Sequence, residues 1–233
     1  MGNTMAASFT KALLAAVPAL AMSLSLAPPA SAWGEYDVVT PGSFLVSTAR
    51  ASNGMPYQCT TGFLVRSGNT PKAFTAGHCN RDPNNNNTVL QRTPDGTRHI
   101  GHYTKWEVSP LRDIGLVDLS RSSVPAVPDL DGSPVRGVMS SEDIRIQRPE
   151  LCKSGARTGT SCGPVTDVSD TTVSFRAWDN LGDSGSPVYA RRADGSVAAV
   201  AILYGHTDDE QGRVIHATLV EPVMKKWNLT LWQ

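Results

Sequence analysis

The sequence predicts an all-β chain, arranged as antiparallel barrels or as a sandwich, and three observations lead to this fold class. The 233 residues include 20 Gly and 16 Pro but only five each of Trp, Tyr and Phe, which is typical of a chain with many turns. Short stretches rich in Val and Thr recur between these turns, and several alternate apolar with polar residues as half-buried strands do. Repeated strand–helix–strand units are not visible, so the many short strands favour antiparallel pairing.

Nine apolar stretches bounded by turn residues are predicted to be strands, at residues 44–47, 62–65, 73–75, 114–119, 135–139, 171–175, 188–190, 197–203 and 215–220. Hairpin turns are predicted at the Gly-containing segments 67–69, 94–96 and 193–195. One helix is predicted near the C-terminus. Pro222 suits its first turn, and an apolar stripe at helical spacing runs from Val223 through Trp227 to Leu231.

Residues 1–32 are predicted to be a secretory signal peptide. Lys11 precedes the uncharged apolar run 12–27, and residues 30–32 (Ala-Ser-Ala) end the segment with small residues typical of a cleavage site. The apolar run has 16 residues and contains Pro18, whereas a spanning helix needs roughly 20 residues. An uncleaved membrane anchor is the alternative. Cleavage after Ala32 would release a secreted, extracellular chain.

Charge and cysteine content narrow the function classes further. The 21 Lys and Arg balance 21 Asp and Glu, which argues against a nucleic-acid-binding protein with a basic surface. Four cysteines in an exported chain indicate disulfides, and four cysteines allow three pairings. Chain order favours the pairs Cys59–Cys79 and Cys152–Cys162. Zinc binding is the alternative, but the sequence contains no C-x-x-C pair.

Residues 182–187 (GDSGSP) provide the strongest candidate nucleophile, Ser184. A serine hydroxyl reacts poorly unless a base removes its proton and hydrogen-bond donors stabilise the oxyanion that forms. Glycines near the serine allow a tight turn in which backbone N–H groups face the same point as the hydroxyl. The alternative is an ordinary surface turn, since Gly, Asp and Ser are common in turns.

Residues 74–79 (FTAGHC) provide a candidate base, His78, which directly precedes a cysteine expected to form a disulfide. A bridge at the neighbouring residue would fix the position of the imidazole ring. The alternative is a partly buried structural histidine. Structural or surface roles are expected for the remaining histidines, which lack a comparable setting: His99, His102, His206 and His216.

Residues 112–119 (RDIGLVDL) provide a candidate acid, Asp113, at the start of an apolar strand. A carboxylate buried there can orient a histidine and stabilise its protonated form. Asp118 is the rival candidate. Because five positions separate the two residues and side chains alternate along a strand, they should point to opposite faces, and we expect Asp118 to be exposed.

The chain order His78, Asp113, Ser184 resembles that of the chymotrypsin-like serine protease family, in which TAGHC, a D-I-x-L-type strand and GDSG-P carry the catalytic triad. Residues 151–163 (LCKSG, then TG and CG) resemble a segment of the secreted streptogrisin and α-lytic-type proteases. Residues 219–223 (LVEPV) resemble the final strand of these enzymes, which leads into a C-terminal helix.

This resemblance implies two antiparallel six-stranded β-barrels packed face to face, followed by a C-terminal α-helix. The barrels would span residues 33–122 and 135–233, joined by a proline-containing linker. His78 and Asp113 would come from the first barrel and Ser184 from the second.

The mechanism implied by the resemblance gives each motif a role. Ser184 Oγ attacks the scissile carbonyl, His78 accepts its proton and returns it to the leaving amine, and Asp113 holds the imidazole tautomer. The backbone N–H groups of Gly182 and Ser184 form the oxyanion hole. Asp183 should be buried and paired with a cation, either an arginine or the mature N-terminus.

The function implied is that of a secreted serine endopeptidase, active as a monomer on peptide or protein substrates. The mechanism needs neither a metal nor an organic cofactor, and neither nucleic acid nor, after signal cleavage, a membrane is expected as a partner. Two other functions use the same fold. One is a catalytically silent binding module, and the other is a secreted serine esterase.

The residues that the resemblance assigns to the primary specificity pocket depart from the family pattern. The residues implied are Trp178, Asp179, Leu203, Tyr204 and Gly205. Leu203 stands where the family usually has a serine that supports the triad. Asp179 would select Arg or Lys, Trp178 would fill the pocket and admit only small residues, and His206 would favour acidic substrates.

Overall fold

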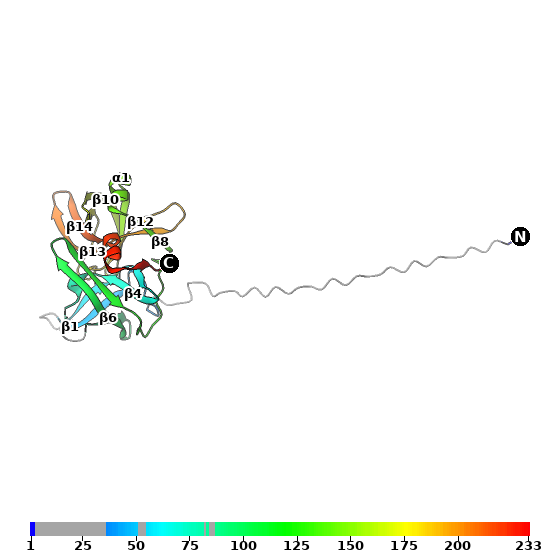
Figure 1. Cartoon of the computed structure of the whole chain (residues 1–233), viewed down its shortest axis with the longest axis horizontal. Coiled ribbons are helices and arrows are strands. Elements are labelled where there is room, and N and C mark those ends of the chain that lie inside the picture. The colour runs from blue at the N-terminus through cyan, green and yellow to red at the C-terminus, as the bar shows by residue number, and fades with distance from the viewer. Residues whose placement is uncertain (3–35, 51–54, 82, 84–86) are drawn as a thin grey trace.

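The structure is a computed structural model that describes residues 1–2, 36–50, 55–81, 83 and 87–233 (Figure 1). The predicted signal peptide and its cleavage site at Ala32 lie outside the described residues. Within the described part of the chain, no helix combines the length and the apolar composition required to cross a membrane. The described residues fold into two β-sheets, two α-helices and a short 3₁₀ turn.

The first sheet contains the strands of the N-terminal half together with one short strand from the C-terminus. Its order is β15-β3-β4-β7-β6-β5-β1-β2, with antiparallel pairing throughout. Only residues 61–63 separate β2 from β3, so the sheet curls until its two ends come close together. The strands are β1 (Phe44–Arg50), β2 (Pro56–Thr60), β3 (Leu64–Ser67), β4 (Thr70–Thr75), β5 (Thr88–Thr93), β6 (Gly96–Ser109), β7 (Arg112–Asp118) and β15 (Thr230–Leu231).

The second sheet closes into a barrel. Its order is β12-β9-β10-β11-β14-β13-β8, and an additional pairing of β12 with β13 completes a six-stranded ring. β8 adds to β13 in parallel, outside the ring. The strands are β8 (Val135–Val138), β9 (Glu150–Gly155), β10 (Gly159–Val168), β11 (Thr172–Arg176), β12 (Pro187–Arg191), β13 (Val197–Asp209) and β14 (Gly212–Leu219). The predicted all-β, double-barrel fold class is confirmed, as is the C-terminal helix.

The C-terminal helix α2 (Val220–Trp227) packs its apolar face into the protein, with Val223, Met224 and Trp227 buried. It ends earlier than predicted. Asn228 adopts a left-handed conformation (φ 53°) that terminates the helix. The chain then pairs with β3 as β15, so Leu231 lies in a strand and not on the predicted helical stripe.

A second helix, α1 (Ser141–Gln147), was not predicted. A capping box starts it: Ser140 Oγ accepts a hydrogen bond from Asp143 N (3.1 Å), and the Asp143 carboxylate accepts one from Ser140 N (2.9 Å). Helices this short carry too little apolar periodicity to be recognised from composition, but the Ser-x-x-Asp spacing is a usable signal.

The buried apolar residues form one cluster inside each sheet and a third between them. This third cluster joins Phe74 and Ile114 of the first sheet to Ile202 of the second and to α2, whose Trp227 ring lies 6.3 Å from that of Phe74. Packing across this cluster fixes the two sheets relative to one another. Residues from both can therefore meet in one site.

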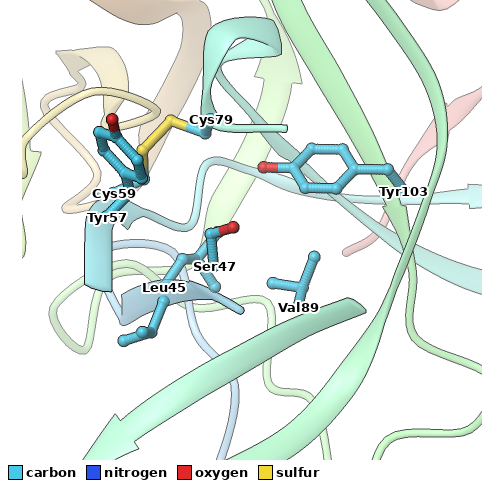
Figure 2. A pocket seen from close by; sticks show the side chains of 8 residues that line it. Leu45, Ser47, Tyr57, Cys59, Cys79, Val89 and Tyr103 are labelled. Atoms are coloured by element: carbon cyan, nitrogen blue, oxygen red, sulfur yellow. A yellow bond between two sulfur atoms is a disulfide. The ribbon is translucent and has the colours of Figure 1, made fainter. Parts of the chain in front are cut away.

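Both disulfides have the pairing that chain order favours. Cys59–Cys79 joins β2 to the 3₁₀ turn η2 (Gly77–Cys79), and Cys152–Cys162 joins β9 to β10. Figure 2 shows the first bridge beside a small pocket that Tyr103 and Val89 also line. The volume of this pocket is about 10 Å³. The bridge therefore anchors the turn that carries His78 to the wall of the first sheet.

Replacing both Cys59 and Cys79 by Ser should lower the free energy of unfolding by about 3 kcal/mol, because a 20-residue loop is no longer closed in the unfolded chain. Urea titration of the oxidised wild type and of the double variant measures this difference. Superimposable unfolding curves would contradict the expected contribution of the bridge.

Candidate active site

His78 lies on η2, in a position that depends on the glycine before it. A Cβ on Gly77 would lie 2.3 Å from the Glu107 carbonyl oxygen and 2.9 Å from that of Ile114. Only glycine therefore allows η2 to pack this closely against β6 and β7. The close packing brings the His78 ring to the start of β7, where Asp113 lies.

His78 and Asp113 are joined by two hydrogen bonds. The Asp113 carboxylate lies 2.7 Å from His78 Nδ1 through Oδ2 and accepts the His78 backbone N–H through Oδ1 at 3.0 Å. Asp113 is almost fully buried. A carboxylate in this position favours the tautomer with its proton on Nδ1, which leaves Nε2 as an acceptor.

Asp113 is held by the second sheet as well as by its own strand. Its backbone N–H donates to Thr218 Oγ1 at 3.0 Å, and the same hydroxyl donates to the Asp113 carbonyl oxygen at 3.0 Å. Thr218 lies on β14, so this pair of bonds ties β7 to the second barrel. The position of the acid thus depends on the packing of both sheets.

Asp118, the rival acid, pairs with Lys72 on the adjacent strand β4 (2.7 Å) and is not part of the His78 contact. It is half-buried and not exposed as expected, because Lys72 covers it. Burial raises the pKa of Asp118, but hydrogen bonds from Lys72 and Ser120 lower it by more, to about 2. This geometry suits a structural ion pair.

Ser184 reaches the same region because its loop packs against the first sheet. Gly185 has a positive φ of 96°, and a Cβ there would lie 2.2 Å from the Thr60 carbonyl oxygen and 2.3 Å from Thr75 Oγ1. The Thr60 N–H donates to the Ser184 carbonyl oxygen at 2.7 Å. Gly182 also has a positive φ (107°), as the tight turn predicted from the glycines requires.

His78, Gly182 and Ser184 line one cleft of about 340 Å³. Within the described residues, His78 and Asp113 are hydrogen-bonded, whereas Ser184 Oγ and His78 share the cleft without a direct hydrogen bond. Contacts of this kind are often long before substrate binds. The structure therefore places His78 and Ser184 in one cleft and Asp113 against His78, although the three residues are 35 or more positions apart in the chain.

Asp183 is buried and paired with a cation as expected, but within the described residues that cation is Lys153, where an arginine or the mature N-terminus was expected. Lys153 Nζ lies 3.0 Å from Asp183 Oδ2, and both side chains are 0% exposed. Thr158 Oγ1 donates to the same carboxylate, and the N–H of Arg157 donates to Oδ1 at 2.9 Å. Burial raises the pKa of Asp183, but these bonds and the ammonium lower it overall.

Two of the predicted specificity residues, Trp178 and Asp179, lie in a cluster with charged side chains. Asp179 is buried and pairs with His206 (2.9 Å) and with Arg213 (3.3 Å). The Arg213 guanidinium lies 4.4 Å from the centroid of the Trp178 ring, and Trp178 is 58% exposed. Leu203 is fully buried, whereas Tyr204 and Gly205 are partly buried.

His206 is exposed and pairs with Asp179, which agrees with the structural or surface role expected for it. Arg213 was not singled out at all, because its position opposite Asp208 depends on the register of β13 and β14. His216, on the same strand, contacts Ser174 Oγ at 2.9 Å.

Residues 60–200 match the family model described as the trypsin-like peptidase domain. Because this match spans more than half of the sequence, the chain belongs to the chymotrypsin-like (trypsin-like) serine protease family.

Solved structures of proteases share the fold. Thermobifida fusca Protease A has 23% sequence identity and a TM-score of 0.60, and the match covers 83% of this chain and 98% of that one. A protease from Nocardiopsis has 19% identity and a TM-score of 0.60, with 84% and 99% covered. A glutamic acid-specific serine protease, described as using a novel histidine triad in substrate binding, has 23% identity and a TM-score of 0.60, with 83% and 100% covered.

Proposed function

We propose that this serine protease is a secreted endopeptidase that cleaves peptide bonds through an acyl-enzyme on Ser184. The observation that carries the proposal is the shared cleft, in which a histidine already hydrogen-bonded to a buried carboxylate stands beside a serine in a tight glycine turn. Secretion is supported by the N-terminal sequence and by two disulfides, which persist in oxidising compartments.

The first half of the reaction forms the acyl-enzyme. The Ser184 O–H proton moves to His78 Nε2 while Oγ bonds to the scissile carbonyl carbon, and the carbonyl π electrons move to the oxygen. The N–H groups of Gly182 and Ser184 stabilise this oxyanion, and Asp113 stabilises the imidazolium. The carbon–nitrogen bond then breaks, and the proton on Nε2 passes to the leaving amine.

The second half repeats these steps with water. His78 Nε2 removes a proton from a water molecule while the oxygen of that water bonds to the acyl carbon. The ester bond to Ser184 Oγ then breaks, and Oγ takes the proton back. Asp183, held by Lys153, positions the backbone of residues 182–184 in both halves and is not itself in contact with the reacting atoms.

A silent binding module and an esterase remain the competing functions, and substrate assays separate all three. The secreted protein is incubated with a diverse peptide library and with p-nitrophenyl esters. The proposal predicts cleavage of internal peptide bonds as well as ester hydrolysis. Ester hydrolysis alone would favour the esterase, and turnover of neither substrate would favour the binding module.

A further inference from the structure

The cleft that holds His78 and Ser184 also reaches residues of β2 and of the segment after η2. Its other walls are formed by Tyr57, Gln58, Arg81 and Leu181, together with Met55 and Pro56. The residues expected to bind the acyl part of a substrate, at 178–179 and 203–205, do not line this cleft. It therefore lies where the residues after the scissile bond, on the leaving-group side, would bind.

An arginine is held at this end of the cleft in a fixed position. The Arg81 guanidinium lies 4.5 Å from the centroid of the Tyr57 ring, a distance suited to a cation–π contact. The Arg81 N–H donates to the Cys79 carbonyl oxygen at 3.0 Å. Because Cys79 is bonded to Cys59, the disulfide holds together the two segments that carry Arg81 and Tyr57.

Tyr57 itself lies beside the Cys59–Cys79 disulfide. Figure 2 shows Tyr57 next to the disulfide at the small pocket, and both Tyr57 and Cys59 line that pocket as well as the cleft. A cation placed on such an anchored ring loses little conformational freedom when it binds an anion.

Within the described residues, no acidic side chain pairs with Arg81. Among the described residues that line the cleft there is no Asp or Glu, and Arg81 takes part in none of the ion pairs formed by the described part of the chain. Its guanidinium N–H groups can therefore bind a substrate carboxylate without first breaking an internal pair.

A second arginine, Arg157, lies close to Gly182 of the cleft. A Cβ placed on Gly182 would lie 3.5 Å from Arg157 Cβ, so this second arginine borders the oxyanion turn. Arg157 and Arg92 both line a neighbouring cavity of about 370 Å³, whose described lining also contains no acidic residue. The positive charge thus continues past the cleft.

We propose that the leaving-group side of this active site selects acidic side chains, with Arg81 on its Tyr57 support as the residue that reads the charge. The inference rests on the proposed endopeptidase function and adds to it a substrate class: peptides with Asp or Glu shortly after the scissile bond.

The test uses matched peptides that share the sequence before the scissile bond, taken from the best-cleaved library members. The first three residues after the bond each carry Asp, Asn or Lys in turn. A p-nitroanilide with the same acyl part, which has no residue after the bond, reports on the catalytic machinery alone. We expect kcat/KM for the best Asp peptide to exceed that for its Asn counterpart by roughly fivefold or more, and the Lys peptide to be poorest.

Variants show whether the preference for Asp comes from Arg81 or from the overall charge of the protein. Arg81→Gln should abolish the preference for Asp over Asn while leaving p-nitroanilide hydrolysis unchanged, and Arg81→Glu should invert the order to favour Lys. Arg191→Gln removes the same charge from an exposed position at the end of β12 and should retain the preference. Raising the salt concentration should weaken the wild-type preference, because exposed charge pairs are screened.

Equal kcat/KM values for the Asp, Asn and Lys peptides, or an Asp preference that survives in Arg81→Gln, would overturn this inference while leaving the endopeptidase function intact. A wild type that hydrolyses neither peptides nor the p-nitroanilide would overturn the proposed function and this inference together.

Discussion

Ser184→Ala should fold like the wild type, yet lose peptide hydrolysis by several orders of magnitude. In a fully coupled triad, loss of the nucleophile costs roughly a millionfold in kcat. The expectation rests on the cleft shared by Ser184, Gly182 and His78, where no other serine is among the lining residues that the structure describes.

The measurement is kcat for one well-cleaved peptide, with Ser123→Ala as the matched control. Ser123 is exposed in the segment between the two sheets, so the same loss of a hydroxyl there should leave kcat unchanged. Melting temperatures show whether both variants remain folded. If folded Ser184→Ala kept most of the wild-type turnover, Ser184 could not be the nucleophile.

The second large effect that we expect is on the free energy of unfolding. Lys153→Met should lower the free energy of unfolding by about 3–5 kcal/mol, because it leaves the Asp183 carboxylate buried without its cation. Lys153→Met combined with Asp183→Asn should recover part of this loss, since the amide carries no charge. Urea titration near pH 7 of the wild type, both single variants and the double variant gives the coupling energy. Additive effects would show that the two side chains do not depend on one another.

The Lys153–Asp183 pair also predicts how the stability lost in Lys153→Met changes with pH. The pKa of Asp183 lies below its ordinary value in the folded protein, so its stabilising contribution is complete above the ordinary carboxyl range, near pH 4, and is lost as the pH falls through the lower folded pKa. Without Lys153, burial should raise the pKa of Asp183 and favour its neutral form. The difference in stability between wild type and Lys153→Met should therefore shrink as the pH falls toward 4, and a difference that grows in acid would contradict the assignment.

Much of the fold was predictable from local patterns. All nine predicted strands overlap an observed strand, because each has an apolar face that the barrels bury. β2, β5, β6, β9 and β10 were not predicted as strands; in β6 most residues are exposed and show no sustained alternation. β15 has only two residues and exists through pairing with β3, so no local signal could indicate it.

The candidate site likewise contains residues that the sequence predicted and residues that it did not. His78, Asp113 and Ser184 lie in motifs that could be recognised in the chain; the structure places His78 and Ser184 in one cleft and Asp113 against His78. Lys153 as the partner of Asp183, and Arg213 between Asp179 and Trp178, depend on packing between strands. Such pairs follow from register and from which turns fold over which strand, and a single sequence does not specify these.

The proposed mechanism requires that His78 activates one hydroxyl, that of Ser184. The most direct test is to treat the purified protein with a fluorophosphonate and map the modified residue by peptide mass spectrometry. We predict a single adduct on Ser184, formed rapidly in the wild type and suppressed in His78→Ala. An adduct on a different residue, or none on a protein that cleaves peptides, would contradict the claim.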